Sequence, residues 1–164
     1  MTVKKSSESL VVMTELVLPN DTNLFENLMG GRLMYWMDIA AALSGSKHCN
    51  APVVTASVDN ISFTNPIKLG NVVHIQAKVT RAFNTSMEVY LKVWGEDIIQ
   101  QNRYNSNEAY YTFVALDPTG KPTLVPPVTL NVTPLGVPAS ETADTDWLLQ
   151  YVWLFKVVET VAVG

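Results

Sequence analysis

The sequence contains few of the residues that build disulfides, metal sites and basic surfaces. Of its 164 residues, one is cysteine (Cys49) and two are histidine. A single cysteine cannot form an internal disulfide and has no companions at zinc-ligand spacing, so we expect a reduced, cytoplasmic protein without a metal site. Lysine and arginine number 11 against 15 acidic residues. This balance supplies no general attraction for nucleic acid or for anionic lipid.

Long apolar runs are also scarce. No segment before residue 140 is long and apolar enough to span a membrane, and residues 1–15 hold no long apolar run. We therefore expect neither a signal peptide nor stable membrane insertion. The chain is still 48% hydrophobic, which suffices for one well-packed domain, expected at residues 1–138. Residues 139–164 form an apolar tail, which we expect to pack at a subunit interface, with attachment to a membrane surface as the alternative.

Apolar periodicity predicts one helix among several strands. Residues 10–18 indicate a strand, and residues 32–46 indicate a helix that is apolar on nearly all sides and therefore buried. From Val54 the period becomes two, with Val54, Ala56 and Val58 in one row and a shift of phase near Asn60 that indicates a β-bulge. Further strands are predicted at 73–79, 87–93 and 110–116, and residues 98–107 are predicted to be a polar loop. The short connections favour antiparallel pairing.

Asp38 is the first candidate catalytic residue. It lies between Met37 and Ile39, in the middle of the apolar helix. A desolvated carboxylate is a better base, and enzymes use such groups to activate water or to attack a carbonyl carbon. The alternative is structural, with Asp38 facing a polar seam or holding a backbone amide. The pattern alone leaves both interpretations open.

Three residues before the helix could assist such an acid. Unhindered amides of Gly30 and Gly31 at the helix start can bind a developing oxyanion, although two glycines also suit a tight turn. The side-chain amide of Asn27 could reach a thioester carbonyl or a water, or Asn27 could only form the turn. A catalytic histidine is not expected, since His74 lies on the polar face of a strand and His48 follows the helix among small polar residues.

Several short motifs also occur in a fixed order. They are Leu-Pro-Asn-Asp-Thr-Asn at 18–23, Asn-Leu-Met-Gly-Gly-Arg at 27–32, Trp-Met-Asp-Ile-Ala-Ala at 36–41, and further segments at 53–59, 63–67, 70–73, 85–89 and 108–122. In order and spacing, residues 10–127 resemble the hotdog-fold acyl-coenzyme A thioesterases of the cytosolic acyl-CoA hydrolase type. An ordered series is far more specific than any one of its motifs.

The resemblance implies an α+β hotdog fold, in which an antiparallel five-stranded sheet wraps around one long central helix. It implies a homo-oligomer, a dimer or a hexameric trimer of dimers, whose subunits pair sheet edge to sheet edge. The family's catalytic aspartate falls on Asp38 and its loop asparagine on Asn27, and family sites combine the two from opposite subunits. The helix-start glycines fall on Gly30 and Gly31, with the Gly31 amide as the expected oxyanion donor.

The implied activity is hydrolysis of acyl-CoA to free fatty acid and coenzyme A, with Asp38 as general base or, alternatively, as a nucleophile. Coenzyme A is then part of the substrate and product, and no metal or redox cofactor is expected. Coenzyme A contacts are expected in a segment similar to one that meets the pantetheine and nucleotide in the family, at Arg81, Asn84, Thr85 and Ser86.

Two other hotdog functions fit the sequence less well. A dehydratase would need a catalytic histidine in the loop and strand region, and no histidine precedes His48. A non-catalytic acyl-CoA sensor would keep the pocket but could discard Asp38, so the presence of both Asp38 and Asn27 favours an enzyme. One departure from the family is Glu26, which stands where many relatives have glycine and is expected to affect the turn or the charge beside Asn27.

Overall fold

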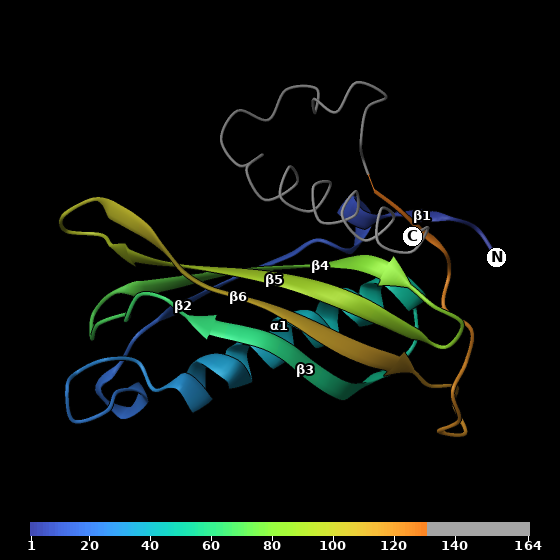
Figure 1. The fold of residues 1–164 in the computed structure, drawn as a ribbon, viewed down its shortest axis with the longest axis horizontal. Coiled ribbons are helices and arrows are strands. Elements are labelled where there is room, and N and C mark those ends of the chain that lie inside the picture. The colour runs from blue at the N-terminus through green and yellow to red at the C-terminus, as the bar shows by residue number, and fades with distance from the viewer. Residues whose placement is uncertain (131–164) are drawn as a thin grey trace, which may run out of the picture. The chain divides into compact units, whose positions relative to one another are not determined.

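A five-stranded antiparallel sheet wraps around one long helix (Figure 1). In this computed structural model the described residues are 1–130. Helix α1 (Gly30–Cys49) lies against the inner face of the sheet, which confirms the α+β hotdog fold. Across the sheet the strands follow the order β2 (Val11–Leu16), β4 (Val72–Ala82), β5 (Ser86–Asp97), β6 (Asn102–Ala115) and β3 (Val53–Phe63).

Short elements complete residues 1–130. Strand β1 (Lys4–Lys5) pairs in parallel with β7 (Val128–Thr129), and two 3-10 turns, η1 (Ser6–Ser9) and η2 (Pro19–Asp21), flank β2. No helix in this part of the chain is long and apolar enough to cross a membrane. The expected boundary at residue 138 and the apolar tail at 139–164 lie outside the described residues.

The core lies between α1 and the sheet. Alternate residues of β4, β5 and β6 point inward because side chains along a strand alternate between its two faces, and they meet Leu33, Met37, Ala40 and Ala41 of the helix. The expectation that the helix is buried on nearly all sides is wrong for residues 1–130. Met34, Tyr35 and Leu43 are exposed, since the sheet covers only one side of α1.

Strand β3 contains two bulges. The register shift between Asp59 and Ser62 confirms the one predicted near Asn60, but a second shift lies between Thr55 and Ser57. Because of this second shift, Thr55 and Val58 pair with core residues of β6 and face the helix, and Val54 faces outward. The predicted single row of Val54, Ala56 and Val58 is therefore wrong. The bulge keeps Thr55 on the helix side of the sheet.

The predicted polar loop at 98–107 is also wrong. Only residues 98–101 form a turn, and β6 begins at Asn102 and continues as a strand paired with β5. Its polar side chains bond the end of β3 and the loop that follows it: Asn107 donates to the Ser62 carbonyl at 2.8 Å and Ser106 donates to the Asn65 carbonyl at 2.8 Å. The polarity of this segment therefore serves tertiary hydrogen bonds rather than solvent exposure.

Candidate active site

Asp21 anchors the loop that leads into α1. Its buried carboxylate accepts a hydrogen bond from the Leu18 amide at 3.1 Å and pairs with Arg32 Nε at 2.7 Å. The Asp21 carbonyl in turn accepts from the Met29 amide at 2.9 Å. Hydrogen bonds between charged groups are short and directional, so this pair keeps Asp21 and Arg32 in a fixed relative position. The loop of residues 19–29 is thereby held against the first turn of the helix.

Glu26 has the backbone conformation that glycine favours, with φ at +57°. Its carbonyl accepts from the Leu69 amide at 2.9 Å, so the loop is bonded to the segment that precedes β4. The Asn23 side-chain oxygen accepts from the Phe25 amide at 2.9 Å and the Asn27 amide at 3.2 Å. The turn before Asn27 is therefore left-handed at position 26 even though glutamate occupies it.

We predict that Glu26→Gly stabilises the protein. A side chain in the left-handed region costs on the order of 1 kcal/mol, and a gain of that size should raise Tm by about 2–4 °C in a thermal melt. Glu26→Ala is the matched control, because it removes the charge but keeps the Cβ atom. An equal gain in both variants would attribute the effect to the charge and contradict the backbone explanation.

The two glycines at the start of α1 have different surroundings. A Cβ atom at Gly30 would lie 3.3 Å from two ring carbons of Phe63, so close packing accounts for this glycine. A Cβ atom at Gly31 would meet nothing within 4 Å. The first helix amides that bond back to the Met29 carbonyl are those of Arg32 and Leu33, both at 3.0 Å. Gly31 is thus an exposed residue in the first turn of α1, at the positive end of the helix dipole.

Asp38 lies on α1 where the helix faces β3 and β6. It is half-buried, and its Oδ1 accepts a hydrogen bond of 2.7 Å from the Thr55 hydroxyl. Burial, and after it the charge of Asp38, raises the pKa of the nearby Tyr111 to about 12. A polar contact between the helix and the sheet, the structural alternative for Asp38, therefore exists. The same Thr55 hydroxyl also orients a carboxylate that could act as a base.

Within one chain, Asn27 and Asp38 occupy different places. A cavity of about 250 Å³ lies beside Asn27, and its lining includes Leu33, Phe63 and Asn107 but not Asp38. Asp38 follows Gly30 by eight helix residues, which corresponds to about 12 Å along the axis. One chain therefore does not bring the predicted loop asparagine to the predicted aspartate.

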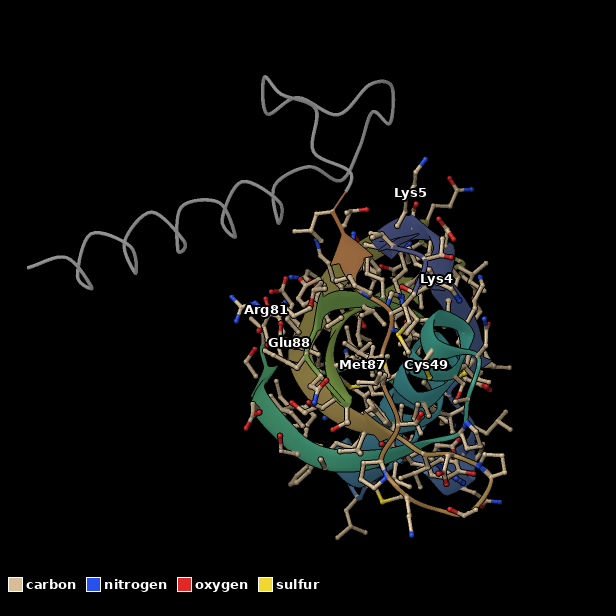
Figure 2. All side chains as sticks on the ribbon, turned by 90° about the vertical axis from the view of Figure 1, so that its right-hand side faces the viewer. Lys4, Lys5, Cys49, Arg81, Met87 and Glu88 are labelled. Atoms are coloured by element: carbon tan, nitrogen blue, oxygen red, sulfur yellow. The ribbon has the colours of Figure 1, made fainter. Side chains whose placement is uncertain are left out.

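The predicted coenzyme A residues lie near the other end of α1. Arg81 is close to the end of β4, Asn84 and Thr85 are in the turn, and Ser86 begins β5. The next residue, Met87, packs on the helix at Gly45, where a Cβ atom would lie 3.4 Å from the Met87 sulfur. Figure 2 views this end of the molecule, with Arg81 and Glu88 at the sheet and Cys49 on the helix. Arg81 Nε lies 3.8 Å from Glu88 Oε1.

Neither histidine contacts the candidate site. The buried His48 places Nε2 2.8 Å from the Pro126 carbonyl, and burial lowers its pKa, so its bond holds the segment before β7 to the helix. His74 Nε2 lies 2.5 Å from Glu96 Oε2. The Cys49 thiol bonds the Ala51 carbonyl at 3.4 Å, and burial raises its pKa. Residues 1–130 contain no group of three or more potential metal ligands.

The sequence pattern gives no sign of a role for Thr55 or Tyr111. Thr55 lies in one of the family-like motifs, but its position beside Asp38 depends on the bulge at Ala56, which the apolar alternation concealed. Tyr111 has the position of an ordinary core residue of β6, with its side chain facing the helix. Only the packing of α1 on β3 and β6 brings the Thr55 hydroxyl to Asp38 and places Tyr111 where the charge of Asp38 acts on it.

Known proteins share this sequence and fold. The family model of the Thioesterase superfamily matches residues 25–100. An uncharacterized acyl-CoA thioester hydrolase of Bacillus subtilis is 42% identical over 121 residues, which are 74% of this chain and 70% of that protein. Acyl-coenzyme A thioesterase 11 of Mus musculus is 47% identical over 105 residues, 64% of this chain. The chain spans only 18% of that mouse protein.

Solved structures extend the similarity. An acyl-CoA hydrolase from Staphylococcus aureus, in complex with butyryl coenzyme A, coenzyme A and coenzyme A disulfide, has a TM-score of 0.77 and 32% identity, covering 98% of this chain and 99% of its own. A hexameric acyl-CoA thioesterase has a TM-score of 0.79 and 30% identity, covering 100% of this chain and 99% of its own.

The antiparallel sheet wrapped around one long helix, together with these relatives, shows a protein of the hotdog-fold thioesterase class. Within that class, the chain belongs to the acyl-CoA thioester hydrolase family.

Proposed function

We propose that this protein hydrolyses acyl-CoA to free fatty acid and coenzyme A in the cytoplasm, with Asp38 as the catalytic carboxylate. The hydrogen bond from Thr55 to Asp38 carries the proposal, because it fixes the orientation of a half-buried carboxylate. The Staphylococcus aureus hydrolase has been solved with an aspartate and with a threonine replaced by alanine. Those two residues are separated by seventeen positions, as are Asp38 and Thr55.

The chemistry uses the chain's own groups and water. Asp38 takes a proton from water as the oxygen attacks the thioester carbonyl carbon. The oxyanion that forms is bound by the Gly31 amide, with Gly30 beside it, and by Asn27. When the intermediate collapses, the carbon–sulfur bond breaks and Asp38 returns the proton to the leaving thiolate. Direct attack by Asp38, through an anhydride that water then hydrolyses, is the alternative route.

We propose that a homo-oligomer completes the site. Asp38 and Thr55 come from one subunit, and Asn27 and Gly31 from its partner, because in one chain Gly31 lies about 10 Å from Asp38 along α1 and Asp38 does not line the cavity beside Asn27. Among residues 1–130, strand β3 is an edge strand that pairs only with β6, and edges of this kind invite pairing with another strand. Val58 and Phe63 on this strand are exposed in the single chain, which favours contact with a second copy as a dimer or within a hexamer.

Coenzyme A is proposed to bind along Arg81, Asn84, Thr85 and Ser86. This segment adjoins the helix at Gly45, which is seven residues beyond Asp38 and about 10 Å along the axis. The segment of residues 81–86 is therefore nearer to Asp38 than to the loop of residues 19–29 in the same chain. The nucleotide and pantetheine would approach the thioester from the subunit that supplies the carboxylate.

Asn23 is a second candidate beside Asn27. The Staphylococcus aureus enzyme has also been solved with an asparagine replaced by alanine, fifteen positions before the aspartate, and Asn23 has the same separation from Asp38. Both asparagines line the cavity at the helix start. The Asn23 oxygen accepts two backbone bonds and so shapes the loop, while its Nδ2 group can still donate to the substrate. We keep Asn27 as the assigned donor and Asn23 as the alternative donor.

Release of free thiol from a panel of acyl-CoA substrates tests this function. The unmodified protein should liberate coenzyme A from at least one chain length, and the panel would identify its preferred acyl group. Tight binding of acyl-CoA with no thiol release from any substrate would contradict hydrolysis and support a non-catalytic sensor.

Thr55→Val should lower kcat about tenfold. Valine has nearly the same shape but no hydroxyl, so Asp38 loses the donor that orients it, and a hydrogen bond to a charged group contributes roughly 1.5–3 kcal/mol. Thr55→Ser is the matched control, because it keeps the hydroxyl and should retain most activity. Equal activity of the valine and serine variants in the thiol-release assay would show that this bond has no catalytic role.

A further inference from the structure

The hydroxyl of Tyr111 is buried without a hydrogen-bond partner in the part of the chain that the structure describes. The residue is 1% exposed, and its ring stacks with Phe113 at a centroid distance of 6.3 Å. Phenylalanine would fill the same core position without burying a polar atom. Because native proteins satisfy nearly all such atoms, the orphaned hydroxyl requires an explanation.

Tyr111 lies on the face of β6 that meets Asp38. Its neighbour across to β3 is Val58, and the neighbour of Thr55 is Phe113, so Tyr111 and Thr55 lie on adjacent strands facing the same stretch of α1. The charge of Asp38 acts on the Tyr111 hydroxyl and, after burial, is the second cause of its raised pKa. At any working pH the group is therefore protonated and can act as a donor.

Asp38 has room for a second donor. Thr55 bonds Oδ1 at 2.7 Å, whereas an ionised carboxylate accepts about four hydrogen bonds through its two oxygens. The other buried orphans among residues 1–130, Ser44 Oγ and His48 Nδ1, belong to residues that follow Asp38 on the helix by six and ten positions. Of the three, Tyr111 is the one that comes from the sheet, where it faces the helix that carries Asp38.

We propose that the Tyr111 hydroxyl is the second donor to the Asp38 carboxylate, acting beside Thr55 in the substrate-bound enzyme. Catalytic hydrogen bonds are often long in the free enzyme and shorten when substrate binds. Tyr111 is thus a positioning residue: two donors from adjacent strands fix the plane of the carboxylate and direct its free lone pair toward the reactive water. The inference rests on the proposed role of Asp38 in thioester hydrolysis.

Tyr111→Phe removes only the hydroxyl. We expect kcat to fall about tenfold, with KM within about twofold of the unmodified protein, because the loss concerns Asp38 and not substrate binding. The melting temperature should stay equal or rise, since an unsatisfied buried atom is removed. Tyr110→Phe is the matched control on the opposite face of β6 and should leave kcat unchanged. A kcat for Tyr111→Phe within twofold of the unmodified value would overturn the proposal.

A double-mutant cycle with Asp38→Asn separates this inference from the proposed function. If Tyr111 acts through Asp38, Tyr111→Phe lowers activity in the unmodified protein but has no further effect on the residual activity of Asp38→Asn. The same fold loss in both backgrounds would overturn the positioning role while leaving hydrolysis intact. Full activity of Asp38→Asn itself would instead contradict the proposed function.

Discussion

Asp38→Ala should reduce kcat for thioester hydrolysis about 10²-fold or more. No other carboxylate meets the Thr55 hydroxyl at the helix–sheet seam of residues 1–130, and loss of a general base removes a contribution of this size. Thiol release at saturating acyl-CoA measures the effect. The fold and the affinity for acyl-CoA should be largely retained, because Asp38 is half-buried at the seam rather than inside the core.

Two further variants make the Asp38 result specific. Asp59→Ala is the matched control, because Asp59 lies on β3, the strand that carries Thr55, but its side chain is exposed and accepts a hydrogen bond from Ser57. It should keep normal activity. Asp38→Asn retains an oxygen that can accept from Thr55 but cannot take a proton, so it should be nearly as inactive as Asp38→Ala. Hydrolysis by Asp38→Ala at a near-normal rate would show that the assignment is wrong.

The order of the elements could be predicted from the sequence. One strand, one long helix and four further strands follow from apolar periods of 3.6 and 2, and the helix predicted at 32–46 lies within the observed Gly30–Cys49. The two added residues at its start include Gly31, whose open surroundings depend on how the loop is held by Asp21 and Arg32. Periodicity shows which face of a helix is apolar, but it carries no information on tertiary contacts such as the ion pair between Asp21 and Arg32.

The errors in prediction fell where side chains serve distant partners. Residues 102–107 are polar in part because Ser106 and Asn107 bond the loop after β3 and the end of β3, so composition suggested a loop where a strand exists. The bulge at Ala56 was hidden because Val54, Ala56 and Val58 alternate as a regular strand would. Thr55 therefore could not be assigned to Asp38 from the pattern, although the acid itself stood out as a lone charge in an apolar helix.

Mixing two inactive variants should restore activity if the site is shared between subunits. Asn27→Ala and Asp38→Ala should each have little activity alone. In a two-fold dimer that contains one chain of each kind, one site receives both substitutions and the other receives neither. With random pairing of equal amounts, half of the dimers are mixed and half of their sites are intact. Recovery should therefore approach about a quarter of the unmodified activity.

This complementation experiment tests most directly the claim that Asp38 of one subunit works with Asn27 of its partner. The two variants are unfolded and refolded together, chain exchange is verified with a mass-tagged copy, and thiol release is compared with each variant refolded alone. The account predicts about a quarter of the unmodified activity in the mixture and little in either control. No recovery despite verified exchange would contradict it, because Asn27 and Asp38 would then act within one chain or Asn27 would serve only the turn.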